Sequence, residues 1–174
     1  MPFIGTSMSC NKLPGAAIGT SSTAAAQFLD SASNPAILYI RPGSSYSNRM
    51  FRVLAYGRAT TGASTNVTIT LYYGISSTIA SNTVIEASTA RAVNTASANW
   101  FIEAVMMYDS TSQKIGGFGR SMVNNLYDAE AALDNAPTSV DLSTEGLGFT
   151  VVGTASASNA STALRLISFE LIPY

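Results

Sequence analysis

Residues 49–74, RMFRVLAYGRATTGASTNVTITLYYG, decide the fold because they hold two amphipathic strand patterns separated by a polar loop. In residues 66–73 apolar and polar side chains alternate with a period of two, which is typical of a half-buried antiparallel strand. Residues 50–58 show the same alternation. Because the loop at 59–65 contains Gly62 and small polar residues, the two strands are predicted to form a hairpin. The predicted core sets are Phe51, Val53 and Ala55 in the first strand and Val67, Ile69, Leu71 and Tyr73 in the second.

The opposite face of the first strand mixes cations with apolar side chains. It carries Met50, Arg52, Leu54, Tyr56 and Arg58. Such a face can pack under another sheet, or it can contact a partner protein. Seven of the nine basic residues are arginine, whose planar guanidinium group suits partly buried pairing with carboxylates. The candidate contacts between subunits are Arg49, Arg52, Arg58, Arg91 and Arg120, and simple solvation at the surface is the alternative.

The composition indicates one β domain that associates readily. A chain of 174 residues is the usual size of a single domain with a real core. Charged residues make up 11%, against about 25% in an ordinary soluble domain. A net charge of −1 gives little self-repulsion, so we expect a homo-oligomer. No nucleic-acid partner is expected, because the nine basic residues are scattered and offset by ten acidic ones.

The chain divides into two segments of different amino-acid composition. Residues 1–35 are rich in small residues and cannot form a core of their own, so they are predicted to be either an N-terminal arm or an edge segment of a sheet. Their apolar anchors Phe3, Ile4 and Leu13 are predicted to bind a partner. Residues 36–174 are predicted to form the β-sandwich domain.

The rest of the chain supplies further strand patterns. They cover residues 36–41, 83–89, 98–109, 114–128, 147–156 and 163–174. With about eight strands and no crossover helices, the predicted fold is all-β, an antiparallel two-sheet sandwich or jelly roll. Gly116, Gly117 and Gly119 indicate a bulge or a close backbone approach. Residues 128–135, DAEAALDN, are predicted to be a short helix or a loop because Pro137 follows.

Catalytic and metal-binding patterns are missing from the sequence. There is no histidine, which removes the usual general base and the histidine-containing triads. The one cysteine, Cys10, cannot form an intrachain disulfide. The carboxylates Glu86, Glu103, Asp109 and Glu170 are better explained as strand-face or turn residues than as a catalytic pair. The acids Asp128, Glu130, Asp134 and Asp141 lack the EF-hand pattern, so a solvated loop is favoured over calcium binding. No catalytic residue, metal or cofactor is therefore predicted.

Two further features concern location and ligands. The N-terminus lacks the basic and apolar regions of a signal peptide, and no run reaches the roughly 18 apolar residues that span a membrane. Synthesis in the cytoplasm and no membrane partner are therefore expected. Four tyrosines that are predicted to be exposed, Tyr39, Tyr46, Tyr56 and Tyr72, form a second hypothesis, because aromatic rings stack on sugars.

Residues 71–125 resemble a recurring pattern in small structural proteins of tailed bacteriophages. The elements that carry this resemblance are LYYG at 71–74, a Thr-Ala-Arg turn at 89–91, W-x-x-E at 100–103 and D-S-T-S at 109–112. They cover about a third of the chain and include no catalytic signature. Proteins of this kind are β-sandwich or jelly-roll subunits of the virion head or tail.

The resemblance implies a virion protein made in the host cytoplasm. The first hypothesis is a capsid decoration (cement) protein that binds and stabilises the shell of major capsid protein, or other virion subunits. Its predicted partner-binding residues are Phe3, Ile4, Leu13, Arg52, Tyr56, Arg58 and Arg120. The alternative is a tail or head-fibre component that recognises host surface glycans.

Overall fold

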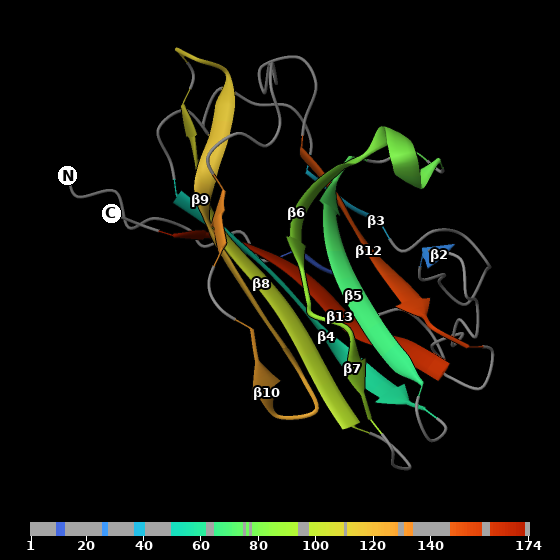
Figure 1. Cartoon of the computed structure of the whole chain (residues 1–174). Coiled ribbons are helices and arrows are strands. Elements are labelled where there is room, and N and C mark those ends of the chain that lie inside the picture. Colours follow the sequence, from blue (N-terminus) through green and yellow to red (C-terminus); the bar gives the residue numbers. More distant parts are fainter. Residues whose placement is uncertain are drawn as a thin grey trace.

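The computed structural model describes two antiparallel sheets packed face to face as a β-sandwich (Figure 1). The described residues are 10–12, 26–27, 37–40, 50–61, 65–74, 76, 78–93, 98–109, 111–128, 131–133, 147–157 and 161–172. In this part of the chain the predicted all-β fold is confirmed. Eight of its thirteen strands are four residues or longer, which agrees with the number expected from the sequence.

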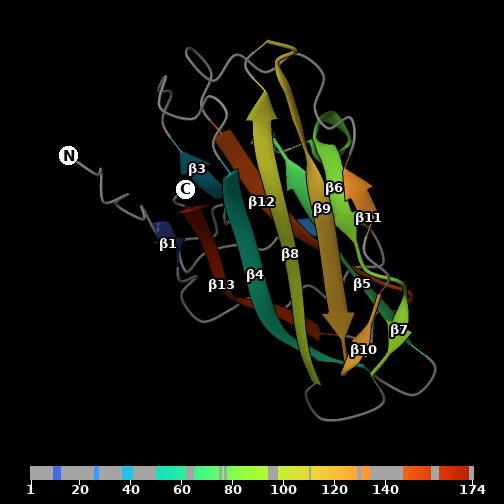
Figure 2. The same cartoon turned by 90° about the vertical axis from the view of Figure 1, so that its left-hand side faces the viewer.

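The first sheet has seven strands and contains the longest strands of the chain. Its order is β1-β13-β4-β8-β9-β10, and β11 also pairs with β9. Figure 2 looks onto this sheet, with β13, β4, β8 and β9 side by side in front of β5 and β12. The strands are β1 (Cys10–Lys12), β4 (Met50–Thr60), β8 (Ala98–Asp109), β9 (Lys114–Val123), β10 (Leu126–Tyr127), β11 (Ala131–Leu133) and β13 (Ser161–Ile172).

The second sheet has six strands. Its order is β2-β12-β5-β6, with β3 also paired to β12 and β7 also paired to β5. A 3-10 turn, Ile79–Ser81, precedes β6. Among the described residues no helix is long and apolar enough to cross a membrane. The strands are β2 (Ala26–Gln27), β3 (Ile37–Ile40), β5 (Asn66–Tyr73), β6 (Thr83–Ala87), β7 (Arg91–Ala92) and β12 (Leu147–Ala155).

The hairpin predicted for residues 49–74 is wrong, although both strand patterns are correct. β4 belongs to the seven-stranded sheet and β5 to the six-stranded sheet, so the connection between them passes from one sheet to the other. The alternation that we expected is present in both strands, because Phe51, Val53 and Ala55 are buried, as are Val67, Ile69 and Leu71. The two apolar faces point toward each other across the core, and neither strand hydrogen-bonds to the other.

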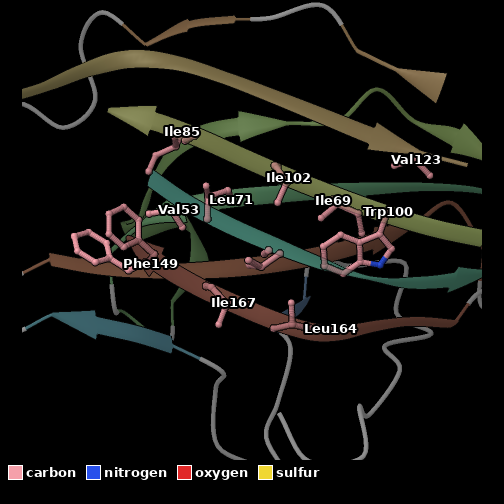
Figure 3. Close-up of a cluster of buried hydrophobic side chains, with 14 of the residues drawn as sticks. Val53, Ile69, Leu71, Ile85, Trp100, Ile102, Val123, Phe149, Leu164 and Ile167 are labelled. Atoms are coloured by element: carbon pink, nitrogen blue, oxygen red, sulfur yellow. The ribbon is translucent and has the colours of Figure 1, made fainter. Parts of the chain in front are cut away.

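The core lies between the two sheets. Figure 3 shows side chains of both sheets pointing into this space, among them Leu71 of β5 and Ile102 of β8. Phe149 of β12 spans the gap, with its ring centroid 6.2 Å from that of Phe51 and 6.5 Å from that of Phe169. Burying one such side chain is worth about 1.5–3 kcal/mol, so these contacts between the sheets hold the sandwich closed.

β9 contains a glycine with positive φ and is followed by a tight turn. Asn124 and Asn125 both have positive φ, 53° and 61°, and they form the two-residue turn to β10 that the sequence did not suggest. Gly117 has φ 157°, and a Cβ there would overlap the carbonyl oxygen of Val105 on β8, so the predicted close backbone approach is confirmed. The helix or loop predicted at 128–135 is wrong for 131–133, which pair as β11 with β9.

The N-terminal segment adds short strands to both sheets. β1 pairs with residues 167–169 of β13, and β2 pairs with residues 152–153 of β12. Phe3, Ile4 and Leu13 lie outside the described residues. The division of the chain at residue 35 and the role of these three residues stay predictions.

Candidate functional site

The outer face of the seven-stranded sheet gathers most of the predicted partner-binding residues. Because side chains alternate along each strand, the residues between the core positions of β4, β8 and β9 all point away from the core. We define the outer face as Met50, Arg52, Leu54, Tyr56 and Arg58 of β4, Asn99, Phe101, Glu103, Val105, Met107 and Asp109 of β8, Lys114, Phe118, Arg120 and Met122 of β9, Tyr127 of β10, and Leu166, Ser168 and Glu170 of β13.

Large apolar side chains on this face are unusually exposed. Met50, Tyr56, Met107, Phe118 and Tyr127 are between 41% and 66% exposed, and they make up five of the eight exposed large apolar residues in the described part of the chain. The strand register groups them. Met50 lies opposite Met107 at one end, and Tyr56 lies opposite Phe101 at the other, where Phe101 meets the ring of Tyr127 edge to face at 5.8 Å. Exposed apolar side chains thus gather at both ends of the outer face, which makes this face a candidate interaction site.

An ion-paired glutamate lies at the middle of the outer face. Glu103 is only 3% exposed, although it points away from the core, because two arginines cover it. Its Oε1 accepts a hydrogen bond from Nε of Arg52, and its Oε2 accepts one from Nε of Arg120 at 2.5 Å. The register explains this arrangement, since Arg120 lies directly opposite Glu103 on β9 and Arg52 lies diagonally from it on β4. Nη1 of Arg52 also lies 3.6 Å from Glu170.

The centre of the outer face combines ion-paired charges with apolar side chains. Glu103 is held between two cations, each of which donates a hydrogen bond to one of its carboxylate oxygens. Both arginine side chains stay partly exposed, 37% for Arg52 and 45% for Arg120, so both remain accessible at the surface. Cations framed by methionine and aromatic side chains are typical of the central part of a protein interface.

The structure brings together four of the seven residues predicted to bind a partner. Arg52, Tyr56, Arg58 and Arg120 all lie on the outer face, and the other three are outside the described residues. Two residues at the centre of the face were not predicted to belong to a site. The sequence pattern predicts only that Glu103 lies on a strand face, and it gives no sign that Phe118 belongs to a site. Only the cross-strand register identifies them, because Glu103 lies opposite Arg120 and Phe118 lies opposite Val105.

The tyrosines do not form one platform. Tyr39 and Tyr72 lie on the outer face of the six-stranded sheet, whereas Tyr56 lies on the opposite side of the sandwich. Tyr39 is exposed and Tyr72 is half-buried, while Tyr46 lies outside the described residues. The described tyrosines therefore cannot bind one sugar chain together, and the aromatic cluster of the outer face is instead Tyr56, Phe101 and Tyr127.

A second polar cluster lies where the edges of the two sheets meet. Asp128, interpreted from the sequence as part of a solvated loop, is instead paired, since its Oδ1 lies 2.9 Å from Nη2 of Arg91. Its Oδ2 accepts hydrogen bonds from the backbone N–H of Thr89 at 3.0 Å and from the hydroxyl of Ser121 at 3.2 Å. Ser121 also lies 3.0 Å from Oε1 of the buried Glu86. Arg91, predicted to contact another subunit, thus forms an ion pair within the chain.

The two carboxylates of this cluster have pKa values shifted in opposite directions. Burial raises the pKa of Glu86, the hydrogen bond from Ser121 opposes the rise, and the charge of Asp128 adds to it. Burial also acts to raise the pKa of Asp128, but the hydrogen bonds from Thr89, Arg91 and Ser121 lower it overall. Ser121 has a single hydroxyl proton and cannot donate it to both carboxylates. When Glu86 is protonated it donates to Ser121, and Ser121 can then donate to Asp128.

We expect Glu86 to make the protein less stable as the pH rises. A raised pKa means that the folded chain keeps this proton to a higher pH than the unfolded chain does. Its stabilising contribution is therefore complete below the unfolded pKa and is lost as the pH rises through the folded pKa. Glu86→Gln mimics the protonated form, so urea unfolding of both proteins from about pH 4 to about pH 8 should show the variant gaining stability relative to wild type. Parallel pH profiles would contradict this assignment.

No described part of the chain offers a metal site. Among the described residues, no three side chains of histidine, cysteine, aspartate or glutamate are grouped closely enough to hold a metal ion. Glu86 and Asp128 are the two carboxylates that a single side chain, Ser121, brings together. Glu103 and Asp109 lie on the outer face, away from that cluster, and the side chain of Asp109 accepts hydrogen bonds from its own turn at Thr111 and Ser112.

The comparisons with known proteins concern the sheet arrangement alone. No protein-family model matches the sequence, and no curated protein matches it significantly. Among solved structures, the chain is similar to arcelin-5, a lectin-like defence protein from Phaseolus vulgaris, at a TM-score of 0.46 and 10% identity over 98% of this chain and 100% of that one. It is also similar to the metal-free form of lectin I-B4 from Griffonia simplicifolia, at a TM-score of 0.37 and 11% identity over 97% and 100% of the two chains.

Proposed function

We propose that this chain is a structural subunit of a tailed-bacteriophage virion, a capsid decoration protein that binds a preformed shell of major capsid protein through its outer face. The observation that carries the proposal is the concentration of exposed apolar side chains on that one face, around the ion-paired Glu103. A decoration protein needs contact area for binding, and the outer face offers exposed apolar side chains around ion-paired charges.

The affinity for the shell comes from many copies of one contact of moderate strength. Burial of methionine and aromatic side chains gives affinity, and the arginines give orientation. A shell presents many copies of the same site, so an oligomer that engages several of them gains avidity without any new contact. The low net charge of −1 keeps neighbouring copies from repelling each other on a crowded surface.

A charge placed at Met107 should abolish most of the binding. Met107→Glu puts an unpaired carboxylate into the apolar end of the outer face, and we expect binding to shells of the same virus to weaken at least about tenfold, or roughly 1.4 kcal/mol. Val84→Glu is the matched control, because Val84 is also 49% exposed but lies on β6 of the other sheet. Co-sedimentation of the purified chain with empty shells measures both. Equal losses in the two variants, or no binding by the wild-type chain, would contradict the proposal.

Glycan recognition is the second candidate function. Tyr56 and Tyr127 are exposed on either side of Phe101 on the outer face, and such rings can stack on a sugar. On this hypothesis Tyr127→Ala removes binding on a glycan array, whereas Tyr39→Ala on the other side of the sandwich does not. Binding to shells but to no glycan decides for the decoration protein.

A further inference from the structure

Two carboxylates share one hydroxyl where the edges of the two sheets meet. Glu86 lies on β6 of the six-stranded sheet, Ser121 lies on β9 of the seven-stranded sheet, and Asp128 follows β10. The hydroxyl of Ser121 is 3.0 Å from Oε1 of Glu86 and 3.2 Å from Oδ2 of Asp128. A hydroxyl has one proton to donate, so both contacts are hydrogen bonds only when one of the two carboxyl groups supplies a second proton.

Glu86 is the group that holds this second proton. It is only 3% exposed, and its Oε2 has no hydrogen-bond partner among the described residues. Asp128 instead forms an ion pair with Arg91 and accepts a hydrogen bond from the backbone N–H of Thr89, and both contacts favour its charged form. The pKa values agree with this assignment, because burial raises that of Glu86, whereas that of Asp128, despite burial, is lowered by its hydrogen bonds.

Few charged groups surround Glu86. The strands of the other sheet that pack against β6 are β8 and β9, and their charged side chains belong to the outer face, away from the cluster. They are Glu103 and Asp109 on β8 and Lys114 and Arg120 on β9. The titratable side chains on the inner faces of β5 and β8, Tyr73 and Tyr108, belong with the apolar core. Within the described part of the chain, the charges beside Glu86 are therefore those of Asp128 and Arg91.

The shared hydroxyl also fixes the segment that follows β9. We define the β10 segment as residues 124–128, which turn back from β9 and pair with its last two residues. Asp128 ends this segment and ties it to the six-stranded sheet at Arg91, and Figure 2 shows β10 and β7 at the same end of the molecule. The neighbouring Tyr127 meets the ring of Phe101 on the outer face. A shift of Asp128 therefore moves an aromatic side chain of the outer face.

We propose that the proton on Glu86 is a latch that holds the β10 segment on β9. With the proton bound, Glu86 donates to Ser121, and Ser121 donates to Asp128. Once the proton has left to water, Ser121 donates to Glu86, which has no other hydrogen-bond partner in the described part of the chain, and two charged carboxylates repel each other across one hydroxyl. Asp128 keeps its ion pair on the six-stranded sheet, so the segment separates from β9. The ring of Tyr127 then leaves Phe101.

Hydrogen exchange of the isolated chain tests the latch. Because the pKa of Glu86 is raised, the latch is closed at low pH and opens as the pH rises through the folded pKa. The backbone N–H groups of Asn124 and Asp128 donate to the carbonyls of Asn99 and Ser121. We expect their protection factors, which correct for the pH dependence of exchange itself, to fall at least about tenfold in wild type between about pH 4 and about pH 9.

Glu86→Gln is the closed variant, because its amide donates to Ser121 at every pH. Its protection factors at Asn124 and Asp128 should change less than about twofold over the same range. The ladder between Val53 of β4 and Phe169 of β13 is the control within the same molecule. If its amides lose protection by the same factor as the β10 segment, Glu86 affects only overall stability and the proposal is overturned. Equal behaviour of wild type and Glu86→Gln also overturns it.

Ser121→Ala is the open variant. Ser121 is fully buried, and alanine removes only its hydroxyl, so thermal unfolding should show a folded protein. The β10 segment should then be weakly protected at both pH values. High protection at about pH 4, equal to that of wild type, would show that the hydroxyl does not hold the segment.

The ring of Tyr127 reports whether the latch reaches the outer face. In wild type its proton resonances should move between about pH 4 and about pH 9 with the same midpoint as the protection factors, and in Glu86→Gln they should stay constant. Tyr39, on the other side of the sandwich, is the control ring. A Tyr127 ring that does not respond in wild type would overturn the proposal. None of these measurements uses shells, so they decide the latch independently of the proposed function.

Discussion

Replacing Phe149 by alanine is expected to lower the free energy of unfolding by about 3–5 kcal/mol, one of the two largest effects of any single change proposed for this chain. Phe149 is fully buried on β12 of the six-stranded sheet. Its ring meets Phe51 and Phe169 of the seven-stranded sheet and stands edge-on to Tyr73 of its own sheet, with the centroids 5.9 Å apart. Truncation removes these contacts and leaves a cavity between the sheets that strands paired on both edges cannot close.

Urea unfolding monitored by circular dichroism measures the effect of Phe149→Ala. Phe149→Leu keeps most of the buried volume and should cost clearly less. Tyr39→Ala is the exposed control, because Tyr39 lies on β3 next to β12 but points to solvent, and we expect a change within about 0.5 kcal/mol. A loss below about 1.5 kcal/mol for Phe149→Ala would mean that Phe149 does not bridge the sheets.

The second large effect is expected at Gly57, where alanine should cost about 3 kcal/mol. Gly57 lies on the inner face of β4, between Leu164 of β13 and Trp100 of β8. A Cβ at this position would overlap both the carbonyl oxygen of Ala163 and the indole ring of Trp100. The carbonyl belongs to the neighbouring strand and cannot rotate away, so β4 and β13 must separate locally.

The sign of the Gly57 effect is its diagnostic feature. In an ordinary strand, glycine is less stable than alanine by roughly 0.5–1 kcal/mol, so the same substitution elsewhere would stabilise the protein. Thermal unfolding of Gly57→Ala, Trp100→Leu and the double variant tests the cause, because relief of the indole overlap should make the double variant more stable than the sum of the single changes predicts. A stabilised Gly57→Ala variant would show that the strands do not approach so closely.

On the proposed function, the outer face suits a chain with few charges to assembly. Its exposed methionine and aromatic side chains are a liability for an isolated protein, and they become core contacts once the capsid shell covers them. The residues concerned lie on three neighbouring strands, β4, β8 and β9.

The extent of the candidate site could be predicted only in part. The alternation in β4 was enough to place Arg52, Tyr56 and Arg58 on one face, because those positions lie two residues apart on one strand. Arg120 was chosen for its chemistry alone. Its position beside Glu103 depends on the pairing of β8 with β9, in which Glu103 lies directly opposite Arg120. Glu103 is buried because of that register, and no local sequence pattern predicts its burial.

The amino-acid sequence by itself determined the fold class, the eight strands of four residues or more and the side chains that line the core. Period-two alternation is a local property, and a strand with one apolar face must bury that face wherever it lies. Only the tertiary structure decided that β4 and β5 lie in different sheets, because the same alternation serves a hairpin and a connection between sheets equally well. It also decided that Glu103 lies between Arg52 and Arg120, since cross-strand neighbours are chosen by register and not by sequence distance.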